Sequence, residues 1–277
     1  MYKPFRINFN DPDKYLYHYT TLDVAIDHIL SSNMMRFSSF LRTNDPRESK
    51  IWRFSYDISG YNKTEIPDVA TKIQQEIQER IKVVCFTRDD PTKFINGSCK
   101  FFYRGYSHPR MWAQYGFNHS GVCLIFNKNI LRVSIYHDVN HIGQIYEGPV
   151  RYRDPDGKMK EYSLSCKLID KLGEEDFIKQ YFEKNHKALF FTKLKDWQSE
   201  LEYRWVLLGK DSSYEYFSII SALEGIVLGA DFPEEYLHYI LDICAESSIP
   251  VIKLDWHNGY PTPITFEGYP RKHQSFV

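Results

Sequence analysis

Short apolar runs of strand-like sequence recur along the whole chain, and segments with helical patterning separate them. The strand-like runs are residues 15–20, 34–39, 83–86, 121–126, 145–153, 201–208, 225–229 and 251–254. Apolar spacing and capping residues indicate helices at residues 22–30, 68–80, 111–115, 160–192 and 233–244. Turn residues follow at 44–46 and 154–157, and a long loop is expected at 88–110. With no repeat or linker, we predict one α+β domain over residues 1–277.

Composition excludes several classes of protein. The chain is 43% hydrophobic, which argues against global disorder, and its net charge of −1 gives no general attraction to nucleic acids or membranes. Any nucleic-acid site must therefore be a local patch. No apolar run is long enough to span a bilayer, and residues 1–6 lack the apolar core of a signal peptide. We therefore expect a cytoplasmic protein without a membrane partner.

Cysteine and motif patterns narrow the chemistry further. The five cysteines are odd in number and lack CxxC spacing, which disfavours a disulfide framework or zinc ribbon. Cys85 and Cys123 lie in apolar runs, so we expect buried thiols. His137 and His141 are four residues apart, but their segment is not convincingly helical and offers no third ligand, so we expect no metal. The sequence also lacks GxGxxG, GxxxxGK[ST], HExxH and GxSxG motifs.

A late cluster of charges offers candidate catalytic groups. In a strand, Glu200, Glu202 and Arg204 would share one face, with the two carboxylates about 7 Å apart. One carboxylate can hold a hydroxyl while the other stabilises positive charge. Arg204 can either steady one of these carboxylates or grip a phosphate. The alternative is the solvated polar face of an edge strand.

Earlier polar residues suit a nucleotide pocket. His18 lies in the first predicted strand and can both donate and accept a hydrogen bond, although a backbone group could equally satisfy it. Ser38 and Ser39 end the second strand, where their hydroxyls could line a pocket. Arg47 could meet a pyrophosphate, although Asn44 to Pro46 just before it are ordinary turn formers.

The segment 93–110 interleaves basic and aromatic residues. Lys100, Phe102, Tyr103 and Arg104 combine phosphate-pairing and base-stacking groups, a pattern typical of single-stranded nucleic-acid binding. The alternative is an ordinary insertion with partly buried aromatic residues.

Six short motifs follow one another along about residues 15–255. They are Leu16-Tyr17-His18-Tyr19-Thr20, Phe37-Ser38-Ser39, Asn44-Asp45-Pro46, Met111-Trp112-x-x-Tyr115-Gly116, Gly121-Val122-Cys123-Leu124 and Trp197-x-x-Glu200-x-Glu202-Tyr203-Arg204. In this order they resemble the prokaryotic domain of unknown function 2971 family. That family carries no assigned activity.

A more distant resemblance is to the ADP-ribosyltransferase superfamily. Its basis is a histidine in the first strand, then a helix, a second strand with small hydroxyls, and a late strand opened by a glutamate. Residues 17–39 are especially similar to the opening of bacterial toxins that ADP-ribosylate DNA. Glu200-Leu201-Glu202 looks like the superfamily's Glu-x-Glu arrangement, although that arrangement usually accompanies an arginine in the first strand. The implied fold is a split β-sheet core with flanking helices.

The resemblance implies an enzyme that cleaves NAD, needs no metal, and acts as a toxin in toxin–antitoxin or anti-phage systems. Its acceptor would be RNA or DNA, or alternatively protein, and its partners an antitoxin and a chaperone. The implied catalytic residues are Glu202, assisted by Glu200, and His18. The implied NAD-binding residues are His18, Tyr19, Thr20, Ser38, Ser39, Arg47, Trp112 and Tyr115. The implied acceptor-binding residues are Lys100, Phe102, Tyr103, Arg104 and Arg204.

Two other functions fit the same residues. A metal-independent ribonuclease toxin would use His18 and a glutamate as acid and base. A non-catalytic module would hold a nucleotide on its aromatic side chains without turnover.

Overall fold

The structure is a computed structural model that describes residues 11–95, 100–154, 162–247 and 249–266. Its strands are β1 (Tyr15–Thr20), β2 (Met34–Ser39), β3 (Phe54–Asp57), β4 (Ile81–Arg88), β5 (Val122–Asn127), β6 (Gln144–Pro149), β7 (Arg151–Arg153), β8 (Tyr162–Ser165), β9 (Thr192–Leu194), β10 (Glu202–Leu208), β11 (Glu215–Ser218), β12 (Leu223–Leu228), β13 (Val251–His257) and β14 (Tyr260–Thr265). Its α-helices are α1 (Pro46–Ser49), α2 (Val69–Glu79), α3 (Pro109–Tyr115), α4 (Lys128–Val139), α5 (Cys166–Leu172), α6 (Glu174–Phe190) and α7 (Leu237–Ser247). A π-helix, η1 (Val24–Leu30), and the 3-10 segments η2 (Phe40–Arg42), η3 (Pro91–Lys93), η4 (Phe101–Tyr103), η5 (Lys195–Glu200) and η6 (Glu234–Tyr236) complete it.

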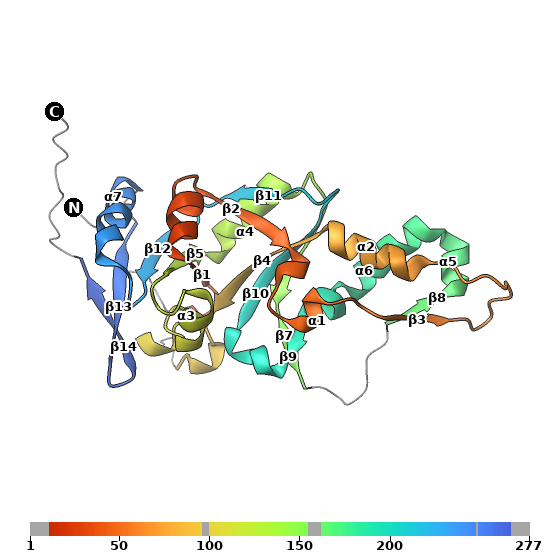
Figure 1. Cartoon of the computed structure of the whole chain (residues 1–277), viewed down its shortest axis with the longest axis horizontal. Coiled ribbons are helices and arrows are strands. Elements are labelled where there is room, and N and C mark those ends of the chain that lie inside the picture. The colour runs from red at the N-terminus through yellow and green to blue at the C-terminus, as the bar shows by residue number, and fades with distance from the viewer. Residues whose placement is uncertain (1–10, 96–99, 155–161, 248, 267–277) are drawn as a thin grey trace.

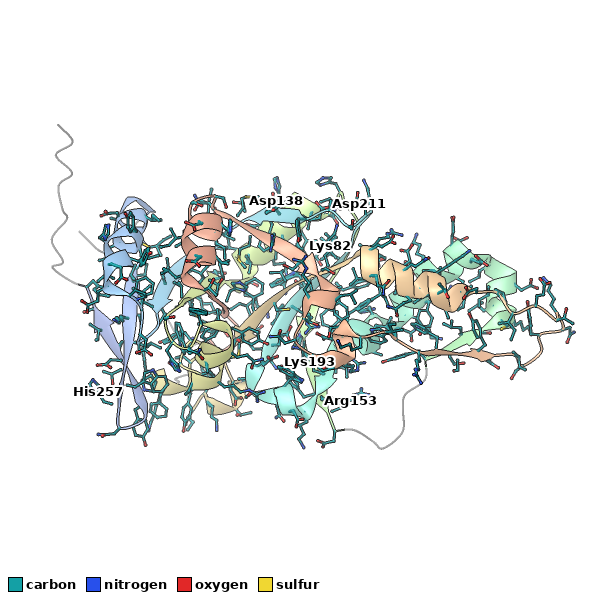
Figure 2. All side chains as sticks on the ribbon, viewed as in Figure 1. Lys82, Asp138, Arg153, Lys193, Asp211 and His257 are labelled. Carbon is teal, nitrogen blue, oxygen red and sulfur yellow. The ribbon has the colours of Figure 1, made fainter. Side chains whose placement is uncertain are left out.

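A ten-stranded sheet forms the centre of the described chain. Its main path runs β11-β2-β4-β1-β5-β12-β13-β14, with β10 pairing β4 and β6. All of its pairings are antiparallel except β12–β13. Helices α2, α5 and α6 project at one end of the long axis, together with β3 and β8 (Figure 1). The β13–β14 hairpin with His257 lies at the other end, and Lys193 lies near the middle (Figure 2).

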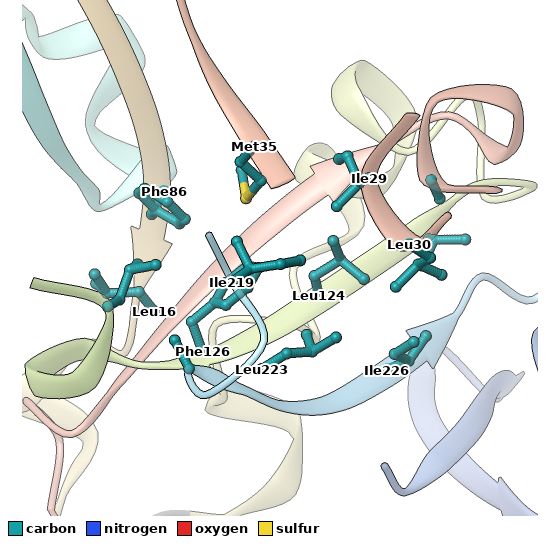
Figure 3. Close-up of a cluster of buried hydrophobic side chains, with 14 of the residues drawn as sticks. Leu16, Ile29, Leu30, Met35, Phe86, Leu124, Phe126, Ile219, Leu223 and Ile226 are labelled. Atoms are coloured by element: carbon teal, nitrogen blue, oxygen red, sulfur yellow. The ribbon is translucent and has the colours of Figure 1, made fainter. Parts of the chain in front are cut away.

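The two faces of the sheet bury different hydrophobic clusters. One face packs Leu16, Phe86 and Phe126 with Ile135 of α4 (the first core; Figure 3). The opposite face divides into two further clusters. The second core lies against α2 and α6, and the third lies around the tyrosines of β1 and Trp112.

The sheet opens between β1 and β4. These strands pair only at Leu16↔Arg88 and Tyr17↔Thr87. Beyond Tyr17, β1 stays paired with β5, whereas β4 continues beside β10 and then meets β2 at Ser38↔Val83. This divergence separates β1 from β2 along the part of β4 that lies between their short pairings with it.

Most expected elements are present, and the mixed α+β class is confirmed. Strands β1 and β2 have the predicted bounds, and α2, β4, β5, β10 and β13 agree within a few residues. The helix expected at 22–30 is a π-helix, the helical region expected at 160–192 contains β8, and the loop 88–110 contains η3 and η4. The expectation that the segment 137–141 is not helical is wrong for His137, which lies in α4, whereas His141 lies beyond the end of that helix. The turn expected at 154–157 falls largely outside the described residues, as do residues 1–6.

The expected burial of cysteines holds only in part. Cys123 is buried between β1 and β12, but Cys85 is half-buried. Strands β3, β11 and β14 and helix α4 were not expected from the sequence.

Candidate active site

A cleft of about 710 Å³ lies where the sheet opens. Its walls come from β1, η1, β2, the segment after η2, β4, α3, and the connection from β9 to β10. Its polar and aromatic lining includes His18, Tyr19, His28, Arg36, Ser38, Ser39, Arg42, Asn44, Tyr115, Lys193, Glu200, Glu202 and Tyr216. The structure therefore brings together His18, Tyr19, Ser38, Ser39, Tyr115, Glu200 and Glu202 from the predicted site.

His18 is fixed as a neutral imidazole. Its Nδ1 lies 3.0 Å from the carbonyl oxygen of Cys85, and a carbonyl can only accept, so Nδ1 carries the proton. Burial lowers the pKa of His18, which keeps the second nitrogen, Nε2, unprotonated at neutral pH. Within the described residues Nε2 has no hydrogen-bond partner, and the half-buried ring lines the cleft. His18 can therefore accept a hydrogen bond from a ligand.

Lys193 joins the two candidate carboxylates at the cleft floor. Its Nζ lies 2.8 Å from Oε2 of Glu200 and 2.7 Å from Oε2 of Glu202. All three side chains are almost fully buried, and Oε1 of Glu200 accepts a 2.6 Å hydrogen bond from the hydroxyl of Tyr115. Two carboxylates against one ammonium leave this floor with one net negative charge.

Glu202 stays ionised although it is buried. Burial by itself opposes the charge, but Arg204 and Lys193 outweigh it and bring the pKa of Glu202 to about 2. Burial lowers the pKa of Lys193 less than its carboxylate neighbours, Glu202 first, raise it, so its pKa is higher than usual. Glu202 and Lys193 are therefore both charged throughout the neutral pH range.

The expected continuous strand face from Glu200 to Arg204 is wrong in one respect. Glu200 ends the 3-10 segment η5, and Leu201 takes a left-handed conformation with φ of 47° before β10 begins at Glu202. The two carboxylates therefore reach Lys193 through a kink in the chain and not by strand alternation.

Arg204 does not face a ligand. Its guanidinium is fully buried and lies 2.6 Å from Oε1 of Glu48 on α1, 2.6 Å from Oε1 of Glu202 and 3.0 Å from the carbonyl oxygen of Phe190. Of the two roles considered for Arg204, the structure shows the contact with a carboxylate, that of Glu202. The expected phosphate contact is wrong, because the arginine is buried and matched by Glu48 behind the cleft floor.

Three residues expected to bind NAD lie away from the cleft lining. Arg47 donates to the carbonyls of Thr192 and Ala188 and to the Tyr162 hydroxyl, so it fastens α1 to the end of α6. Trp112 is fully buried against Tyr19, and its Nε1 donates to the carbonyl of Tyr106 at 2.8 Å. Thr20 is also buried.

The four residues of the loop expected to bind nucleic acid lie in different environments. Arg104 is buried, 2.5 Å from Oδ2 of Asp89 and 2.9 Å from the Tyr17 hydroxyl, so it cannot offer its charge to a surface ligand. Lys100 and Tyr103 are exposed and Phe102 is half-buried, and none of them lines the cleft. The ring of Phe102 instead packs against Tyr103 and against Tyr260 of the β13–β14 hairpin.

Sequence reasoning missed Lys193, Arg36 and Arg42. Lys193 is the middle residue of the three-residue strand β9, which is too short for its sequence to signal that the lysine is buried. Arg36 offered a usable signal, because strand alternation between the buried Met35 and Phe37 turns it toward the opposite face.

Comparison with known proteins adds one partial match. Residues 111–205, from α3 to the middle of β10, match a family described as "Protein of unknown function (DUF2971)". No curated protein and no solved structure matches the chain.

The described residues are 11–95, 100–154, 162–247 and 249–266, and they lack membrane-spanning helices and groups of metal ligands. No helix there has the length and apolar character needed to cross a membrane, and no group of three or more histidine, cysteine or acidic side chains is placed to hold a metal ion.

Proposed function

We propose that the protein transfers ADP-ribose from NAD to an acceptor held at this cleft. The observation that supports it most is the meeting of a neutral histidine from β1 with two carboxylates from the η5–β10 connection on one cleft. The family match carries no activity, so the proposal rests on the chemistry of His18, Glu200 and Glu202 and on the resemblance of their sequence order to ADP-ribosyltransferases.

The cleft suits a dinucleotide in size and in chemistry. Its volume falls within the roughly 300–1,000 Å³ of small-molecule sites. Tyr19 and Tyr115 provide aromatic surface for a nicotinamide ring. The acceptor nitrogen Nε2 of His18 matches a ribose hydroxyl or the amide N–H of nicotinamide.

The negative floor suits the bond to be broken. NAD supplies a cationic leaving group: the bond from nicotinamide to C1′ of the ribose breaks, its electron pair stays on nicotinamide, and positive charge develops on the sugar. Glu202, held ionised by Arg204 and Lys193, would stabilise that charge without having to reorient.

Glu200 would complete the transfer. A lone pair of the acceptor forms the new bond to C1′, and the acceptor's proton passes to a carboxylate of Glu200. Tyr115 and Lys193 hold the two oxygens of this carboxylate, which fixes its direction. We propose RNA or DNA as the acceptor, with protein as the alternative, in a toxin–antitoxin or anti-phage setting.

The test incubates the protein with labelled NAD and separate pools of RNA, DNA and cell protein. We expect label in one pool, and we expect Glu202→Gln to lower the rate by roughly 10²–10³-fold because one charge-stabilising group is lost. Glu235→Gln, on the exposed segment η6, is the matched control and should retain full activity.

Circular dichroism of Glu202→Gln would check that it folds. Full activity in a folded Glu202→Gln variant would remove this carboxylate from the mechanism. Cleavage of RNA without NAD would favour the ribonuclease alternative, and nucleotide binding with no product in any pool would favour the non-catalytic module.

A further inference from the structure

Two arginines line the cleft without an acidic partner. Arg36 projects from β2 and Arg42 ends η2, and both side chains are exposed. In the part of the chain that the structure describes, neither makes an ion pair or a hydrogen bond. This sets them apart from Arg47, Arg104 and Arg204, whose guanidiniums are all engaged inside the fold.

Both guanidiniums lie close to the ring of one tyrosine, Tyr214. The Cζ of Arg36 lies 4.4 Å from the ring centre of Tyr214, and the Cζ of Arg42 lies 6.0 Å from the same centre. Stacking on a ring face leaves the N–H donors at the edge of a guanidinium available. Strand pairing strengthens the arrangement, because Tyr216 of β11 lies opposite Arg36 of β2 and also lines the cleft.

The cleft is consequently polarised. Its floor carries one net negative charge at Glu200, Glu202 and Lys193, whereas Arg36 and Arg42 bring two positive charges. Asp27 of η1 is the other acidic residue among the described lining residues, and it forms no ion pair with either arginine. Two neighbouring guanidiniums with unused donors fit a phosphate group better than any neutral ligand.

We propose that Arg36 and Arg42, beside the ring of Tyr214, form a phosphate-binding rim of the cleft. The proposal rests on the proposed function in one respect, since it assigns the rim to a phosphate-bearing ligand of the same site. That phosphate belongs either to the diphosphate of a nucleotide in the cleft or to the backbone of a nucleic-acid acceptor. Both sources present the same anionic oxygens, and binding measurements separate them.

The test measures binding of ADP, adenosine and a twelve-nucleotide single-stranded DNA by calorimetry, with wild type, Arg36→Gln and Arg42→Gln. A charge-assisted hydrogen bond contributes about 1.5–3 kcal/mol, so each substitution should weaken phosphate binding roughly 10- to 150-fold. Adenosine binding should be unchanged. Arg53→Gln, an exposed arginine outside the cleft, is the matched control.

Each outcome has a defined meaning. Weaker ADP binding in the two rim variants assigns the rim to a nucleotide diphosphate, whereas weaker binding of the oligonucleotide alone assigns it to the acceptor backbone. Equal affinities in the rim variants and in Arg53→Gln, or no binding of ADP and of the oligonucleotide by wild type, would overturn the proposal. None of these binding measurements requires catalysis. If ADP binding depends on the two arginines but NAD is not cleaved, the phosphate-binding rim is supported and only the proposed enzyme activity is contradicted.

Discussion

The carboxyl group of Asp89 is buried in the folded protein. Its Oδ1 accepts a 2.8 Å hydrogen bond from the backbone N–H of Gly105, and its Oδ2 meets Arg104 and the Tyr17 hydroxyl. Burial nevertheless raises the pKa of Asp89 to about 6, although Arg104 opposes this. The unfolded chain would titrate this carboxyl near pH 3.9. Between these values the folded state holds the proton more tightly, so this group stabilises the fold at low pH.

Asp89→Asn should therefore change how stability depends on pH. The stabilisation from protonated Asp89 is complete below about pH 4 and is lost as pH rises through about 6, at no more than about 1.4 kcal/mol per pH unit. We expect the free energy of unfolding of wild type, relative to the variant, to fall from pH 4 to pH 6.5 in urea titrations. A difference that stays constant with pH would contradict the assigned pKa.

Single residues also mark the limit of prediction from sequence. His18, Glu200 and Glu202 could be chosen because their residue types and order suggest chemistry. The burial of Arg104 and of Arg204 could not be predicted, because their partners Asp89 and Glu48 lie 15 and 156 positions away and only the fold brings them together. The sequence does not show whether a charged side chain faces solvent or pairs with a buried counter-ion.

At the scale of elements, the kink between η5 and β10 sets the geometry of the carboxylates. Leu201 has φ of 47° and ψ of 43°, its N–H bonds to Gln198, and its carbonyl accepts from Arg88 of β4. A left-handed backbone costs a residue other than glycine about 1–2 kcal/mol. The chain tolerates this strain at the point where Glu200 and Glu202 both turn toward Lys193.

Leu201→Val should destabilise the protein, whereas Leu201→Gly should be tolerated. A β-branched side chain is strongly disfavoured at positive φ, so we expect the valine variant to lose about 1–2 kcal/mol of unfolding free energy. Glycine adopts this conformation freely, and its greater unfolded-state entropy roughly cancels the relieved strain. Urea unfolding of both variants checks this. Equal stability of the two would show that the kink is not strained.

Helices and strands could be predicted where their burial produces a strong pattern of apolar residues in the sequence. Strand β1 is buried along almost its whole length and β5 is a run of buried apolar residues, and both could be predicted. Strand β11 is only four residues long and begins with a charged residue, and α4 begins with Lys128 and Asn129. The local sequence therefore indicates neither the strand nor the helix. Their place is set by pairing with β2 and by packing on the sheet.

At the scale of the whole molecule, β4 and β10 belong to two hydrophobic cores at once. Val84 and Phe86 of β4 face the first core, whereas Ile81 and Val83 face the second. On β10, Trp205 faces the first core and Val206 the second. The helical end of the molecule therefore shares its central strands with the part that carries the cleft, and we predict that the two cannot unfold separately.

Two cavity-forming substitutions test this cooperativity. Ile73 of α2 lies in the second core and Ile135 of α4 in the first, and both are fully buried. Changing either one to alanine should cost about 2–5 kcal/mol. We expect each variant to move one and the same transition, with far-ultraviolet ellipticity and tryptophan fluorescence changing together, because Trp52 reports on the second core and Trp205 on the first. If Ile73→Ala instead produced an early transition that left the Trp205 environment intact, the helical end would be a separate folding unit.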